Sequence, residues 1–267
     1  MLPGILREAE RRAAAARGER PRLEREAARA PDPPDFVASL AAGGRVAVIA
    51  EIKRRSPSAG RLGAAVAGDV AALGRRLAEA GAAALSVLTE PRHFDGSLED
   101  LVRVAAAVRV PVLRKDFLLD PAQLYEARAA GAAAVLLIAR VVPGERLAEL
   151  ADVARGLGLA CLVEVHADSE LMPALAARPA ALGVNARDLD TLAMDAALVE
   201  RLIPRIPGEV VAVAESGLAT RGDVERVAAR GADAVLVGTA ISGAADPGAA
   251  LGSLVGVERR GRAERAP

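Results

Sequence analysis

Residues 80–85 read Ala-Gly-Ala-Ala-Ala-Leu, and the same pattern returns as AGAAAV at residues 130–135 and as RGADAV at residues 230–235. The three glycines therefore lie 50 and then 100 residues apart. Each one suits the position just after a helix, where a left-handed backbone conformation ends the helix before a strand begins. Because two βα units take about 50 residues, this spacing predicts a longer series of alternating helices and strands.

Eight short apolar runs extend this series along the chain, separated by stretches of Ala, Arg and Glu with helical composition. The predicted strands are residues 46–52, 84–88, 110–113, 134–138, 160–165, 181–184, 210–214 and 234–237. Eight parallel strands are the number that closes an α/β barrel, so we expect a single (β/α)₈ TIM barrel. A doubly wound parallel sheet is the alternative, although it would not need eight evenly spaced strands.

The chain length of 267 residues fits one such barrel, which normally needs about 250. We expect an N-terminal helical extension over residues 1–45, with a helix from 2 to about 17, a charged stretch and a breaker at residues 31–34. This extension is too short to hold a core of its own, so it should pack against the barrel. The barrel should span residues 46–258, with a last helix near 247–257 and a frayed tail over residues 259–267.

Composition points to small-molecule partners in the cytoplasm. Thirty-five basic residues balance thirty-five acidic ones and only 1% of the chain is aromatic, so a nucleic-acid surface has little support. No apolar run reaches the roughly 18–20 residues that span a membrane, and the N-terminal segment, which carries Glu8, Glu10 and Glu19, does not resemble a targeting signal. The single cysteine, Cys161, can form no internal disulfide, and neither it nor the two histidines, His93 and His166, show the spacing of metal ligands.

Two lysines stand out because they are the only ones among thirty-five basic residues. A chain that uses Arg wherever a cation suffices should keep Lys53 and Lys115 where a compact ammonium with a movable pKa is needed. Strand alternation places both on the same strand faces as other polar residues. If these faces line the barrel interior, the following residues converge on its C-terminal mouth, where barrel enzymes hold their active sites: Glu51, Lys53, Lys115, Glu164, Asn185, Arg187 and Glu215.

The ends of the last two strands suggest a phosphate site. Glu215-Ser216-Gly217 closes the seventh strand and Gly238-Thr239 closes the eighth, each before a helix. These two loops are the customary phosphate site of barrel enzymes, although glycines also simply make tight turns there. The loop at residues 56–60, Ser-Pro-Ser-Ala-Gly, could close on a ligand from the first strand.

Several motifs then resemble, in order, those of the indole-3-glycerol phosphate synthase family. They are IAEIKRRSPS at residues 49–58, LSVLTE at 85–90, FDGS at 94–97, LRKDF at 113–117, LVEVH at 162–166 and ESG at 215–217. The resemblance runs from about residue 36 to 250. It implies a (β/α)₈ barrel with an N-terminal helical extension that acts in tryptophan biosynthesis. The chain departs from the family at Ala186 and Ala214, which replace polar residues that would support the site.

The resemblance also implies a reaction and its residues. The substrate would be 1-(2-carboxyphenylamino)-1-deoxyribulose 5-phosphate, which undergoes ring closure, decarboxylation and dehydration without a cofactor or metal. The implied catalytic group comprises Lys115 as general acid, Glu164 as second proton-transfer group, Lys53 on the substrate carboxylate, and Glu51, Asn185 and Ser216. The implied substrate-binding group comprises Ser56, Gly217, Gly238 and Thr239 for the phosphate, Phe94 and Phe117 for the aromatic ring, and Arg187 and Glu215.

Such an acid needs a pKa near that of the medium, so we expect the pKa of Lys115 to be lowered. Two other functions stay open at this point. An aldolase-like barrel would use Lys115 as a Schiff-base amine, which borohydride would trap. A non-catalytic barrel would only bind a sugar phosphate, but it would tolerate Arg in place of the lysines. The resemblance leaves open an association with other enzymes of tryptophan biosynthesis.

Overall fold

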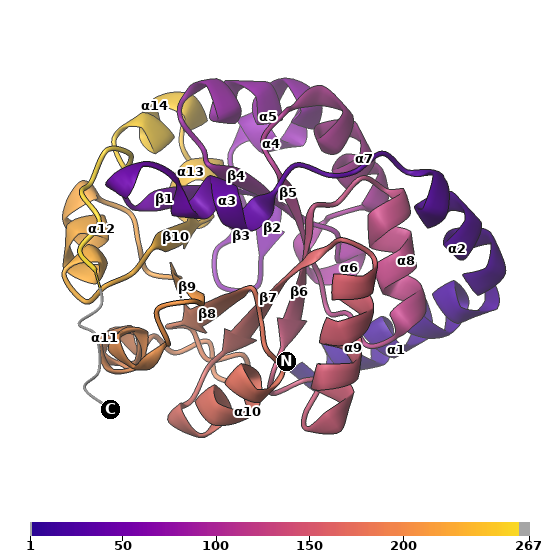
Figure 1. Ribbon diagram of the computed structural model, residues 1–267. Helices are drawn as coiled ribbons and strands as arrows, with labels where there is room; N and C mark the ends of the chain where they lie inside the picture. Colours follow the sequence, from indigo (N-terminus) through magenta and orange to yellow (C-terminus); the bar gives the residue numbers. More distant parts are fainter. Residues whose placement is uncertain (1, 262–267) are drawn as a thin grey trace.

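The computed structural model describes residues 2–261, and its centre is a closed barrel of eight parallel strands (Figure 1). The strands follow one another around the barrel in chain order, and β1 closes it by pairing with both β4 and β10. This closure confirms the (β/α)₈ barrel and excludes the open doubly wound sheet. The strands are β1 (Ala47–Ile52), β4 (Ala84–Leu88), β5 (Val112–Lys115), β6 (Ala134–Ile138), β7 (Ala160–Val165), β8 (Ala181–Asn185), β9 (Val211–Glu215) and β10 (Ala234–Val237).

Three strands extend further toward the mouth than their apolar runs predicted. β5 begins at Val112, because Pro111 has no N–H for the ladder, and it continues to Lys115, which pairs with Leu88. β8 and β9 run on to Asn185 and Glu215, and these two residues pair with each other. Lys115, Asn185 and Glu215 are therefore carried to the mouth on strands, not on loops.

Helices cover the outside of the barrel between successive strands (Figure 1). The outer helices are α5 (Val70–Glu79), α7 (Leu98–Ala107), α8 (Pro121–Ala129), α9 (Glu145–Gly156), α10 (Leu171–Ala176), α11 (Ala196–Leu202), α12 (Arg221–Ala228) and α14 (Pro247–Gly252). Shorter segments are α4 (Ala64–Ala67), α6 (Pro91–Phe94), α13 (Thr239–Ser242), three 3₁₀ turns, Ala42–Gly44, Asp168–Glu170 and Ile203–Arg205, and a hairpin of β2 (Arg55–Ser56) and β3 (Gly60–Arg61). The last helix therefore ends earlier than expected, at Gly252.

The core has two parts, because side chains of the barrel strands alternate between inside and outside. Outward residues such as Val48 and Val135 pack under the helices. Inward residues such as Ile49, Leu113 and Leu162 fill the barrel interior. Aliphatic side chains make up both parts almost entirely.

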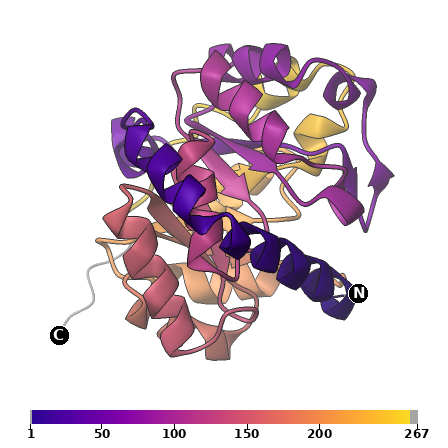
Figure 2. The ribbon, with the colours of Figure 1, turned by 90° about the vertical axis from the view of Figure 1, so that its right-hand side faces the viewer.

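The N-terminal extension runs along one side of the barrel from its base to its mouth (Figure 2). Helix α3 (Phe36–Ala41) closes the base, where Phe36 and Leu40 pack on the inward residues at the starts of the strands. Helix α2 (Arg20–Arg29) lies along α8, and α1 (Leu2–Gly18) continues to the mouth, where Ile5 lines the cavity described below.

Helix α2 was not predicted from the charged stretch that forms it. Arg20 pairs with Glu24 and Arg22 with Glu26, each one helical turn apart, which supports a helix of mostly charged residues. Its few apolar side chains, Leu23 and Ala27, are buried.

The described residues end close to the barrel base. The backbone N–H of Arg259 donates to Gly44, and the remainder of the expected tail, residues 262–267, lies outside the described residues. Within residues 2–261, no helix is long and apolar enough to cross a membrane.

Candidate active site

A cavity of about 530 Å³ opens at the C-terminal mouth of the barrel. Every site residue expected from the sequence lines it: Glu51, Lys53, Ser56, Phe94, Lys115, Phe117, Glu164, Asn185, Arg187, Glu215, Ser216, Gly217, Gly238 and Thr239. The strand ends bring these residues together because parallel strands of a barrel all point toward one rim.

Lys115 lies between two buried carboxylates. Its Nζ is 2.7 Å from Glu164 Oε2 on β7 and 2.7 Å from Glu215 Oε2 on β9. The side chains of Glu164 and Glu215 are each only 2% exposed. The Lys115 ammonium therefore bridges the carboxylates of Glu164 and Glu215. Strand alternation had predicted that these side chains point into the same space.

These charges set the protonation of the three groups. Burial would lower the pKa of Lys115, but the carboxylates of Glu164, Glu215 and Glu51 outweigh burial and raise it. The sequence had led us to expect a lowered pKa, and that expectation is wrong for this arrangement because two acids, not a second cation, surround the ammonium. Lys115 is therefore held in its protonated form.

The two acids titrate in opposite directions. Burial raises the pKa of Glu215, and the nearby negative charge of Glu164 adds to this effect against the attraction of Lys115. Burial also opposes the ionisation of Glu164, but Lys115 and His166 together lower its pKa well below the usual value. Two carboxyl groups whose environments separate their pKa values in this way are suited to acid and base roles.

Lys53 forms the second cationic group, directly after β1. Its Nζ lies 2.7 Å from Glu51 Oε1, and its backbone N–H donates to Ser242 Oγ at 3.2 Å. The Ser242 hydroxyl in turn donates to the Glu51 carbonyl at 2.7 Å, which ties α13 to the end of the strand. The side chain of Lys53 is 13% exposed and reaches the cavity.

Two inward glycines make room for these acids. A Cβ on Gly183 would lie 2.1 Å from Glu215 Oε1, and a Cβ on Gly238 would lie 2.2 Å from Glu51 Oε1. Both distances are far below van der Waals contact, so any side chain would displace a carboxylate. The sequence suggested Gly238 only for phosphate binding, and it did not suggest Gly183.

The loop after β9 has the backbone geometry of an anion site. Ser216 and Gly217 both adopt left-handed conformations, with φ of 68° and 71°. Strain of this kind in a non-glycine residue is typical of functional sites. Within residues 2–261, the backbone N–H groups of Gly217 and Leu218 have no acceptor, so they are free to bind an anion.

Apolar side chains also line the cavity. Phe117 and Phe94 are joined there by Leu136, Ile138 and, from α1, Ile5. Ile5 is a site residue that the sequence reasoning missed. The apolar spacing of Leu2, Ile5, Ala9, Ala13 and Ala16 along α1 was the available signal, because it marks one buried helix face.

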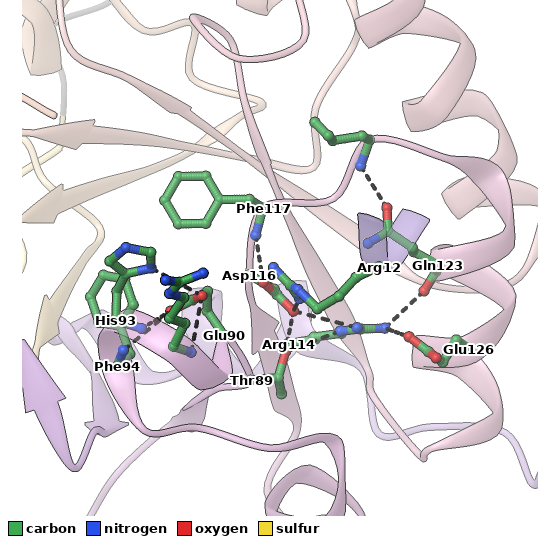
Figure 3. Close-up of polar contacts among 12 residues, drawn as sticks. Arg12, Thr89, Glu90, His93, Phe94, Arg114, Asp116, Phe117, Gln123 and Glu126 are labelled. Carbon is green, nitrogen blue, oxygen red and sulfur yellow. Dashed lines mark hydrogen bonds and ion pairs between the residues drawn. The ribbon is translucent and has the colours of Figure 1, made fainter. Parts of the chain in front are cut away.

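Asp116 fixes the backbone between Lys115 and Phe117 (Figure 3). Its Oδ1 accepts the Phe117 N–H at 2.8 Å, and its Oδ2 accepts from Thr89 Oγ1 and from Arg12 Nη1, each at 2.6 Å. The side chain of Asp116 is wholly buried, and Arg12 reaches it from α1. The extension is therefore bonded directly to the strand end that carries Lys115.

No metal cluster accompanies these groups among the described residues, where three or more His, Cys, Asp or Glu side chains nowhere gather in a binding arrangement. Cys161 is a buried free thiol in the layer under the helices, and burial raises its pKa to about 12. It is therefore a core residue.

Comparisons with known proteins agree with this geometry. The family model described as indole-3-glycerol phosphate synthase matches residues 2–254. A protein of that name from Leifsonia xyli subsp. xyli is 48% identical over 259 residues, which cover 96% of this chain and 97% of the relative. Another from a Parafrankia species is 50% identical over 233 residues, covering 87% and 86%.

A solved structure with the same fold is a thiamine phosphate pyrophosphorylase from Pyrococcus furiosus. It covers 82% of this chain and 96% of its own, with a TM-score of 0.60 and 16% identity, so the likeness concerns the fold alone. The match to the family model and to curated relatives extends over nearly the whole chain. The chain belongs to the indole-3-glycerol phosphate synthase family.

Proposed function

We propose that this chain converts 1-(2-carboxyphenylamino)-1-deoxyribulose 5-phosphate into indole-3-glycerol phosphate, carbon dioxide and water. The observation that carries the proposal is the protonated Lys115, held at 2.7 Å from both Glu164 and Glu215 at the edge of an apolar cavity. Ring closure needs an acid at the ketone oxygen, and this ammonium is the buried acid available there.

Lys115 donates its proton to the ketone oxygen as the ring carbon attacks the ketone carbon. Lys53, at the end of β1, pairs with the substrate carboxylate until that group leaves as carbon dioxide. Glu164 is ionised and lies beside Lys115, so it accepts or returns a proton in the dehydration step. Glu51 holds Lys53 in place, and Asn185 and Arg187 lie near the hydroxyl groups of the substrate chain.

The phosphate and the aromatic ring define the two ends of the substrate. The free N–H groups at residues 217 and 218, with Ser216, Gly238 and Thr239 beside them, bind the phosphate, and Ser56 approaches it from the loop after β1. Phe94 and Phe117, which also line the cavity, hold the aromatic ring.

The protonation of Lys115 favours this reaction over a Schiff base. A Schiff-base lysine must be neutral to attack a carbonyl, whereas the neighbouring carboxylates raise the pKa of Lys115 and keep it charged. Simple binding of a sugar phosphate would not require two buried acids around one lysine, because burying such groups is costly.

Product formation tests the proposal directly. Purified protein mixed with the substrate should yield indole absorbance and fluorescence, and this chain has no Trp to obscure the signal. Lys115→Met serves as the matched inactive control, since it keeps the side-chain volume and removes the acid. Absence of product from the folded parent protein, or covalent trapping by borohydride, would overturn the proposal.

We also propose that the protein works in the cytoplasm on this small phosphorylated molecule, without a nucleic-acid or membrane partner. The lack of a helix able to span a membrane within residues 2–261 and the balanced charge of the chain support this.

A further inference from the structure

His166 is a buried histidine that the reaction described above does not use. It follows β7 two residues after Glu164, so strand alternation puts both side chains on one face. Its side chain is wholly buried, and it does not line the cavity. Its Nε2 lies 3.1 Å from Glu164 Oε1, on the side of Glu164 that faces away from Lys115.

The two oxygens of Glu164 therefore have different neighbours. Oε2 accepts from Lys115 Nζ, and Oε1 faces the imidazole. Neither ring nitrogen of His166 makes an aligned hydrogen bond within the described part of the chain. The close contact with Glu164 therefore leaves the hydrogen-bonding capacity of the ring unsatisfied. A buried imidazole with unsatisfied nitrogens next to a catalytic carboxylate calls for a functional explanation.

A second acid lies on the other side of the ring and leads toward the surface. His166 Nδ1 is 3.9 Å from Glu170 Oε2, and that same oxygen accepts the backbone N–H of His166 at 2.7 Å. Glu170 Oε1 accepts from Arg140 Nε at 2.8 Å, and Arg140 also donates to Asp188 at 2.9 Å. The side chain of Glu170 is 14% exposed, so water reaches this end of the chain of contacts.

The proposed reaction requires such a path, because it consumes a proton. Ring closure adds a proton to the ketone oxygen. The carboxylate leaves as neutral carbon dioxide, and its electron pair restores the aromatic ring. Dehydration adds a second proton to the departing hydroxyl and releases one from the adjacent carbon. Two protons are taken up and one is returned, so each turnover draws one proton from the solvent.

We propose that His166 is a positioning and proton-relay residue that delivers this proton to Glu164 from solvent at Glu170. The ring takes up a proton at Nδ1 and releases its Nε2 proton to Glu164 Oε1, and no bond other than N–H and O–H changes. After the product leaves, Glu164 passes a proton from cavity water to Nε2 and Nδ1 returns its proton at Glu170, which restores the first tautomer. Imidazole suits the task because its ordinary pKa lies near neutrality. The inference rests on the proposed function.

His166→Gln tests the relay, because an amide can contact Glu164 but cannot carry a proton. We expect kcat to fall by about 10- to 100-fold, the scale for removal of a partner behind a functional group, with KM nearly unchanged since His166 does not line the cavity. Added imidazole buffer, at fixed pH and ionic strength, should restore part of the lost kcat in the variant and leave the parent unaffected. A merely structural role would not respond to buffer.

His93→Gln is the matched control, because the chain has only two histidines. His93 also lies beside a glutamate, with Nδ1 3.2 Å from Glu90 Oε1, but this pair lies outside the cavity. We expect parent-like kcat and no response to imidazole. If His166→Gln keeps the parent kcat, or loses it without any rescue by buffer, the relay is refuted.

A measurement on the parent protein covers the case in which His166→Gln does not fold. With two histidines, the ring ¹⁵N signals can be assigned by comparison with His93→Gln. The relay requires the resting ring to carry a proton on Nε2, which faces Glu164, and a resting ring protonated on Nδ1 alone would refute the relay. Parent activity on the substrate is measured first, so a parent that forms no indole product refutes the proposed function and not the relay alone.

Discussion

Gly183→Ala should disable Lys115 without changing any charged residue. The new Cβ would lie 2.1 Å from Glu215 Oε1 and 3.1 Å from its Cδ. The carboxyl group must therefore retreat by roughly 1 Å, which breaks its 2.7 Å contact with Lys115 Nζ. A displacement of this size at a reacting group typically costs about 10²-fold in rate. Overpacking should also lower the free energy of unfolding by about 1–3 kcal/mol, which corresponds to a fall in Tm of about 5 °C.

Steady-state kinetics by indole fluorescence and thermal unfolding by circular dichroism measure the two effects. Gly156→Ala is the matched control, since a Cβ there meets nothing within 4 Å and its backbone is helical. It should keep full activity and gain about 0.4–1 kcal/mol from the lower entropy of the unfolded chain. If Gly183→Ala retains turnover within about twofold of the parent, Glu215 does not act through its contact with Lys115.

Three further predictions concern Lys115 and the extension. Lys115→Arg should keep the fold by circular dichroism and lose about 10²-fold or more in kcat, because a planar guanidinium cannot take the place of the compact ammonium that bridges Glu164 and Glu215; near-normal turnover would remove the acid assignment. Arg12→Ala should lower the free energy of unfolding by about 3 kcal/mol at pH 7, since it breaks a buried pair with Asp116. Burial opposes the ionisation of Asp116, but the charges of Arg114 and Arg12 outweigh burial and lower the pKa of Asp116. The stabilisation by this pair is therefore present above the ordinary carboxyl pKa, and it disappears as the pH falls through the pKa of Asp116 in the folded protein. Urea unfolding at about pH 7 and pH 3 checks this, and an equal loss at both would contradict it. A chain shortened to begin at Pro34 should stay folded but lose affinity and turnover together, because Ile5 leaves the cavity wall; full activity would mean that the extension only packs.

The sequence alone was sufficient to predict the barrel and the group of residues that gather at its mouth. Apolar runs mark strands because a strand buried on both faces excludes polar residues until its end. Strand period then decides which end residues point inward, and this placed Lys53, Lys115, Glu164 and Glu215 together before any contact was known. Lys53 and Lys115 were singled out because lysine is otherwise absent from the chain, and this argument rests on the chemistry of the ammonium group and not on its place in the fold.

Tertiary structure decided what those residues do to one another. Glu215 lies 100 residues beyond Lys115 in the chain, and only barrel closure brings its carboxylate within 2.7 Å of the ammonium. That contact reverses the expected direction of the Lys115 pKa, because electrostatic interaction depends on distance in space. The space at Gly183 and the bond from Arg12 to Asp116 likewise exist only where separate segments meet. Local pattern fixes which face a side chain occupies, but its charge state follows from neighbours that folding alone supplies.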